Sequence, residues 1–207
     1  MSRQGMVVLA VIVSGALAWP SAEPQSGGRI GTGRVTTDAR CVANLGMGQK
    51  SGRRFCDVII AQTAVESVAM VVPARAGPAT LRFDLHNRFV VSDARRPPAE
   101  AFERHAALVA IVTGAGEEIV RAAVTREYRT IEDVFDRISG GGRDAGLKAV
   151  APGGAEAVVA ILPEGVTSIG IVGVNLERVS AGGREMFDAP GRPVALASNF
   201  RIEYTPR

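Results

Sequence analysis

Short apolar runs separated by turn residues dominate the chain from Phe55 onward. The clearest covers residues 80–91, where the two kinds of side chain alternate: Leu81, Phe83 and Leu85 on one face, Arg82, Asp84 and His86 on the other. A period of two predicts a strand with one solvated face. Residues 106–113 are apolar on both faces, which predicts a central strand covered on both sides.

Turn residues join further apolar runs into two predicted hairpins. Gly114–Gly116 joins 106–113 to 118–128, and Pro163–Gly165 joins 155–162 to 166–179. The remaining predicted strands are residues 55–62, 65–72 and 199–204.

One segment has helical spacing instead. Ile131, Val134, Phe135 and Ile138 stand at i, i+3, i+4 and i+7. Thr130 precedes them as a candidate N-cap, and Gly140–Gly142 follow them. This predicts one short helix among eight or nine strands. The pattern as a whole predicts an all-β fold, a two-sheet β-sandwich of immunoglobulin-like or jelly-roll type with one short helix.

The N-terminal residues predict export. Residues 1–18 combine a basic start, the apolar run Met6–Ala18 and the small-x-small pattern Ala16-Leu17-Ala18, which is the layout of a signal peptide. The run has 13 residues, fewer than the roughly 20 of a membrane-spanning helix, so cleavage after Ala18 is favoured over retention as an anchor. Residues 19–38, rich in Pro, Ser, Gly and Thr, predict a flexible leader, and residues 39–207 a single domain without a stable membrane span.

The two cysteines, Cys41 and Cys56, predict a disulfide, because an exported chain folds in an oxidising compartment, the periplasm or the extracellular space. The formal net charge is only +3, and the basic pairs Arg53–Arg54 and Arg95–Arg96 are scattered, without interleaved aromatic residues. That distribution is not typical of a nucleic-acid binder. These arginines are therefore expected to be solvated loop side chains.

Candidate chemistry is sparse. Asp84 and His86 lie two apart on one strand face, where a carboxylate could orient a general base, but no Gly-x-Ser-x-Gly motif supplies a nucleophile. A solvated face with local ion pairs to Arg82 and Arg88 is the favoured interpretation. His86 and His105 stand in different segments and Asp133 and Asp136 are expected to face solvent, so no metal site is predicted.

The glycine-rich residues 139–144 lack the Lys-Ser/Thr of a phosphate-binding loop, and no cofactor is predicted. The sequence therefore favours an exported, non-catalytic binding or scaffolding module for an envelope or extracellular protein or glycan. Residues 92–100 and 139–144 are its expected binding edges. Two alternatives stay open: a small secreted hydrolase that uses Asp84 and His86, and a carbohydrate-binding module, although no Trp follows Trp19.

Overall fold

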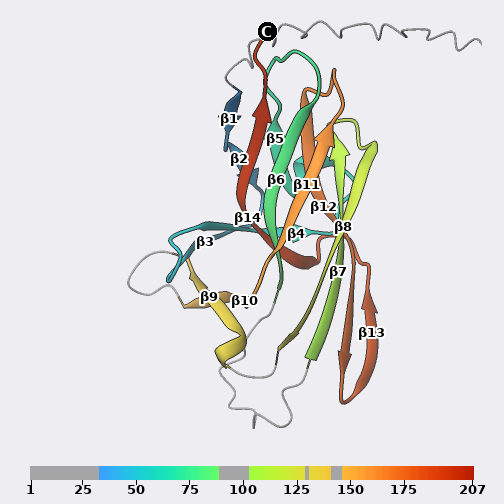
Figure 1. Cartoon of the computed structure of the whole chain (residues 1–207). Coiled ribbons are helices and arrows are strands. Elements are labelled where there is room, and N and C mark those ends of the chain that lie inside the picture. Colours follow the sequence, from blue (N-terminus) through green and yellow to red (C-terminus); the bar gives the residue numbers. More distant parts are fainter. Residues whose placement is uncertain (1–32, 89–102, 129–130, 141–145) are drawn as a thin grey trace, which may run out of the picture. The chain divides into compact units, whose positions relative to one another are not determined.

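The computed structural model describes residues 33–88, 103–128, 131–140 and 146–207, and within them the chain is almost entirely β-strand (Figure 1). The strands are β1 (Arg34–Thr36), β2 (Ala39–Cys41), β3 (Asn44–Gly48), β4 (Arg54–Ile59), β5 (Val68–Val71), β6 (Ala79–Asn87), β7 (Glu103–Thr113), β8 (Glu118–Tyr128), β9 (Val134–Ser139), β10 (Leu147–Pro152), β11 (Glu156–Leu162), β12 (Ser168–Ser180), β13 (Gly183–Phe187) and β14 (Pro193–Tyr204). Two single helical turns, η1 (Ala64–Glu66) and η3 (Ile131–Asp133), complete the described elements.

The strands form two antiparallel sheets that pack on each other, so the predicted β-sandwich is confirmed. The first sheet has the order β10-β9-β3-β4-β14-β6-β11, with β1 paired to the C-terminal part of β14. The second has the order β2-β5-β12-β7-β8, with β13 paired to the C-terminal part of β12. The β7–β8 pair is the hairpin predicted at Gly114–Gly116.

The main core fills the space between the two sheets. Leu81, Phe83 and Leu85 of β6 all point into it, as their spacing predicted, and Phe83 stacks on Phe200 of β14 with ring centroids 6.3 Å apart. β7 is covered on both faces, as predicted. Its residues Ala107, Val109 and Ile111 face the main core, whereas Ala110 and Val112 pack with Ala64 of η1 on the other side.

A second core lies on the opposite face of the first sheet. We call β3, β9 and β10 the arm. Its residues Leu45, Ile138, Ala149 and Ala151 pack with Phe55 of β4 and Leu196 of β14. Chain neighbours of Phe55 and Leu196 point into the main core. The arm therefore buries part of a sheet face that the alternating pattern predicts to be solvated.

Asn199 resets the alternation within β14. It has a φ of +56°, the left-handed conformation that Asn adopts more readily than most residues, and the pairing of β14 with β6 shifts register between Ser198 and Arg201. A bulge of this kind lets Ala197 and, three residues later, Phe200 both face the main core, while Ser198 points to the other side.

The predicted helix at residues 131–138 is wrong. Only Ile131–Asp133 forms a helical turn, and Val134–Ser139 is strand β9, between β3 and β10. Its buried residues Asp136 and Ile138 are two apart, not three or four. β-branched and aromatic residues suit a strand, and strands on both sides supply the backbone hydrogen bonds that decide the conformation.

The second predicted hairpin is also wrong. β11 pairs with β6 in the first sheet, whereas β12 pairs with β5 and β7 in the second, so Pro163–Gly165 crosses between sheets. The run predicted at 65–72 begins with η1 and becomes a strand only at Val68. Arg34–Thr36, within the predicted leader, forms β1, and residues 1–32, which include the predicted signal peptide, lie outside the described residues.

The predicted disulfide between Cys41 and Cys56 is present and joins β2 of one sheet to β4 of the other, with Cα atoms 5.5 Å apart. Disulfides are typical of proteins that fold in an oxidising compartment. No helix in the described residues has the length and apolar character needed to cross a bilayer.

Candidate functional site

His86 is buried, contrary to the expectation of a solvated strand face. It is 1% exposed beneath the arm, and its ring stacks on Phe135 of β9 with centroids 6.1 Å apart and packs at a tilt on Phe55, 5.5 Å away. Burial is the largest effect on His86 and lowers its pKa to about 4. The carboxylates of Asp84 and Asp136 raise the pKa, but the positive charges of Arg53 and Arg126 oppose them. The imidazole is therefore neutral at pH 7.

Ser198 is the polar partner that sequence analysis missed. Its hydroxyl oxygen lies 3.3 Å from His86 Nε2, and its side chain is completely buried. It stands 112 positions away from His86 on β14, the strand next to β6. No local motif signals this contact, because it depends on the pairing of β14 with β6.

Asp84 does not orient His86 through a hydrogen bond. Its carboxylate accepts a hydrogen bond from Arg53 at 2.8 Å and one from the side-chain amide of Asn199 at 3.4 Å. His86 Nδ1 has no hydrogen-bond partner among the described residues. The structure therefore brings a serine and a histidine together but directs the carboxylate elsewhere, and it closes both the hydroxyl and the imidazole to solvent.

The basic pair Arg53–Arg54 next to this site is exposed, as expected, but each side chain also has a polar partner. Arg53 is paired with Asp84, and Arg54 donates a hydrogen bond of 2.7 Å to the carbonyl oxygen of Ala39, which links β4 to β2 of the other sheet. Arg88, expected near Asp84, pairs instead with Asp57 at 2.5 Å. The second basic pair, Arg95–Arg96, lies outside the described residues.

Asp136 is also buried, contrary to expectation. Its carboxylate accepts hydrogen bonds from the backbone amides of Lys50 and Ser51, at 2.9 and 3.0 Å, and from the Ser51 hydroxyl. Burial favours the protonated carboxyl, but the hydrogen bonds from Ser51, Lys50 and Arg137 outweigh it and lower the pKa of Asp136 below its ordinary value. Asp136 therefore holds the turn between β3 and β4 as a carboxylate.

Gly48, at the end of β3, gives this carboxylate its space. A Cβ at this position would overlap the Asp136 carboxylate and approach the Phe55 ring to 2.8 Å. Any larger residue here would therefore displace the Asp136 carboxylate or the Phe55 ring.

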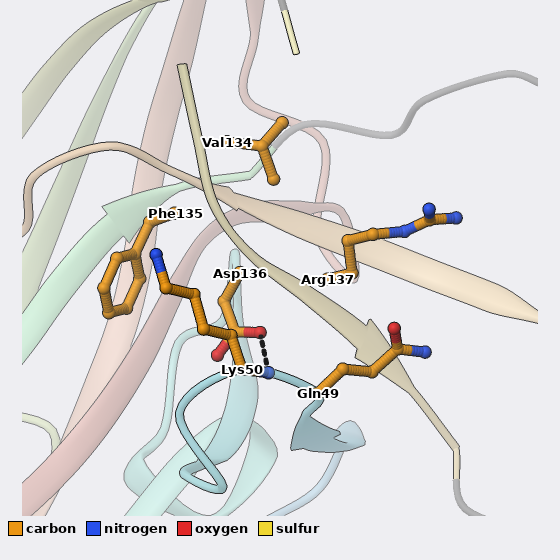
Figure 2. A pocket seen from close by; sticks show the side chains of 6 residues that line it. All are labelled: Gln49, Lys50, Val134, Phe135, Asp136 and Arg137. Carbon is orange, nitrogen blue, oxygen red and sulfur yellow. Dashed lines mark hydrogen bonds between the residues drawn. The ribbon is translucent and has the colours of Figure 1, made fainter. Parts of the chain in front are cut away.

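A shallow hollow of about 300 Å³ lies where the β3–β4 turn meets β9, lined by Gln49, Lys50, Val134, Phe135, Asp136 and Arg137. Figure 2 shows Lys50 beside Phe135 on one side of Asp136, and Gln49 with Arg137 on the other. Lys50 Nζ is 5.7 Å from the Phe135 ring centroid, and Arg53 approaches the same ring at 5.9 Å. Neither Lys50 nor Arg137 has an ion-pair partner among the described residues.

The other candidate residues do not converge. His105 is buried on β7 of the second sheet, whereas His86 is on β6 of the first. The described residues contain no group of three His, Cys, Asp or Glu side chains that could hold a metal ion. Of the two predicted binding edges, residues 92–100 lie outside the described part of the chain, and residues 139–144 are described only for Ser139 and Gly140.

Comparison with known proteins finds no matching family, no similar curated protein and no similar solved structure.

Proposed function

We propose that this protein is an exported, non-catalytic binding module and that the hollow beside β9 is its ligand site. Export rests on the signal-peptide pattern of residues 1–18, and the Cys41–Cys56 disulfide supports an oxidising compartment, periplasmic or extracellular.

The observation that carries the proposal is the pair of cations without carboxylate partners around an apolar wall. Eight of the eighteen basic side chains in the described residues have such a partner, among them Arg53, Arg82 and Arg88. Lys50 and Arg137 instead stand beside Val134 and Phe135 with their charges available to an anion. Rigid strands and the Asp136 contacts hold their backbones in place.

This lining fits an anion that also has an apolar surface. A uronic-acid glycan has both, since its ring C–H groups can contact Val134 and Phe135 while its carboxylates accept hydrogen bonds from Lys50 and Arg137. The proposed ligand class is therefore an acidic glycan of the envelope or extracellular space.

The test is calorimetric titration of the mature protein with oligogalacturonate, and with dextran as the neutral control. Wild type is expected to bind the acidic glycan and not dextran. Lys50→Gln and Arg137→Gln should each weaken binding about tenfold or more, the usual effect of losing a charge-assisted hydrogen bond. Arg34→Gln removes an exposed cation from β1 and should leave the affinity unchanged. An equal loss in all three variants would show attraction by net charge, and no binding would contradict the ligand class.

A small hydrolase is the second candidate, and the contact between Ser198 and His86 is the observation that favours it. A general base supplies about 10²–10⁴ in rate, and the remainder needs a nucleophile that reaches substrate and a site for the oxyanion. Ser198 and His86 are closed to solvent, so we expect no turnover on ester or glycoside panels. Turnover in wild type that disappears in Ser198→Ala and in His86→Ala would favour the hydrolase over the binding module.

A further inference from the structure

The edge strand β11 lacks the features that protect the other described sheet edges. A free edge offers unpaired backbone groups to another strand, and proteins block it with short length, charge or proline. β1 and β2 have three residues each, and β10 contains Lys148 and ends at Pro152. β8 and β13 carry charged side chains along their length: Glu118, Arg121, Arg126 and Glu127 on β8, Arg184 and Glu185 on β13.

β11 has none of these features. Its sequence is Glu-Ala-Val-Val-Ala-Ile-Leu, and its one charged residue, Glu156, stands at the start and pairs with Arg126 at 2.7 Å. It pairs with β6 through all seven residues without a bulge. On the outer face of the sheet, Val159 and Ile161 are 50% and 59% exposed. The strand is therefore regular, apolar and open on one side.

We propose that β11 pairs with β11 of a second copy of this chain, antiparallel about a two-fold axis at Val159. In that register Val159 meets Val159 of the partner, and the large Ile161 lies opposite the small Ala157 on the exposed face. The two inner positions next to the axis, Val158 and Ala160, are likewise paired large against small.

The charges also permit this pairing. Glu156 lies opposite Leu162 of the partner, so no like charges face each other, and its charge is already matched by Arg126 of its own chain. Because β11 is self-complementary in size and charge, two copies pair with each other and neither β11 edge stays free. The β11 edge is thus satisfied by the chain itself, without a different protein.

The dimer would be weak and would keep the hollow available. Pairing one short strand buries less than the roughly 1,200–2,000 Å² of a stable interface, so association should depend on concentration in the micromolar range or above. β11 and the arm strands β9 and β10 stand at opposite ends of the strand order. A dimer through β11 would carry two hollows, which increases avidity for a polymeric ligand.

Sedimentation equilibrium of the mature protein over a hundredfold range of concentration tests the proposal. Wild type is expected to shift from monomer to dimer, and Val159→Lys to stay monomeric at concentrations at least tenfold higher. Val71→Lys is the matched control: Val71 is 74% exposed on β5, which is paired with β2 and β12, and its variant should dimerise like wild type. Thermal unfolding of each variant verifies that it is folded.

Cross-linking tests the register. Val159→Cys should form a disulfide-linked dimer on mild oxidation, whereas Val71→Cys should not, with the native Cys41–Cys56 bond verified by peptide mass. A wild type that is monomeric at every concentration, or that forms open-ended polymers, would overturn the proposal and leave the edge for a different partner. A dimer that persists in Val159→Lys, or a Val159→Cys variant that fails to cross-link, would overturn it as well.

Discussion

The imidazole Nε2 of His86 lies 3.3 Å from the hydroxyl oxygen of Ser198, and both side chains are closed to solvent beneath the arm. The histidine is neutral there because burial disfavours its charged form, and the rings of Phe55 and Phe135 pack on it. It acts in the structure as a polar member of the second core. Protonation should therefore loosen the packing between the arm and the first sheet.

The pH dependence of stability follows from this burial. The pKa of His86 is about 4 in the folded protein and 6.5 in the unfolded chain, so between these values the unfolded chain binds more protons. The contribution of His86 to stability is then most favourable above pH 6.5 and becomes less favourable by about 3 kcal/mol as the pH drops to 4. Urea unfolding of wild type and His86→Gln at pH 7 and pH 4 measures this difference.

The difference between wild type and His86→Gln separates the effect of His86 from that of other acid-sensitive groups. His86→Gln should lose less stability between pH 7 and pH 4 than wild type does. Asp136, whose pKa is lowered, loses its contribution only below its ordinary value near 3.8, and it does so in both proteins. Equal losses in wild type and variant would contradict the burial of a neutral histidine.

Asp136→Asn should destabilise the protein by about 2 kcal/mol at pH 7. The variant keeps the size of the side chain but replaces a carboxylate that accepts from Lys50 and Ser51 by an amide with one acceptor oxygen, and hydrogen bonds to a charged group contribute about 1.5–3 kcal/mol. Urea unfolding measures the change. Asp188→Asn, at an exposed position, is the matched control and should change stability by less than about 0.5 kcal/mol.

Local pattern predicted the parts of this fold that depend on neighbouring residues. Leu81, Phe83 and Leu85 alternate with polar residues, and burial of one face of a strand leaves that signature whatever strand lies beside it. The β7–β8 hairpin was likewise predictable because its turn is short. The disulfide could be predicted from the compartment that residues 1–18 indicate and from the even number of cysteines.

The candidate site depends on distant pairing and could not be predicted in the same way. Asp84 and His86 share one strand face, yet Asp84 faces Arg53 while the arm covers His86, because the arm reaches only part of that face. Ser198 lies on β14, 112 positions after His86, and next to the bulge at Asn199. The apolar spacing of β9 predicted a helix because nothing in the sequence marks β3 and β10, the short strands that pair with it.

Processing is predicted to remove residues 1–18. The apolar run Met6–Ala18 is too short to span a bilayer by itself and ends at a small-x-small pattern that a signal peptidase accepts. The intact mass of the protein recovered from the periplasm or medium should match a chain that starts at Trp19. A product that keeps Met1 and sediments with membranes would support an anchor instead.

Removal of the disulfide should cost about 2–5 kcal/mol, the usual range for small exported domains. The Cys41–Cys56 bond joins β2 and β4, which belong to different sheets, and closes a loop whose cysteines are 15 positions apart. Thiol labelling of the unreduced, denatured protein should find no free cysteine, and the Cys41→Ser, Cys56→Ser double variant should unfold at lower urea concentration. Since Arg54 also links β4 to the backbone of β2, the variant should still fold at low temperature. Two labelled thiols in the native protein, or a double variant as stable as wild type, would contradict a stabilising bridge between the sheets.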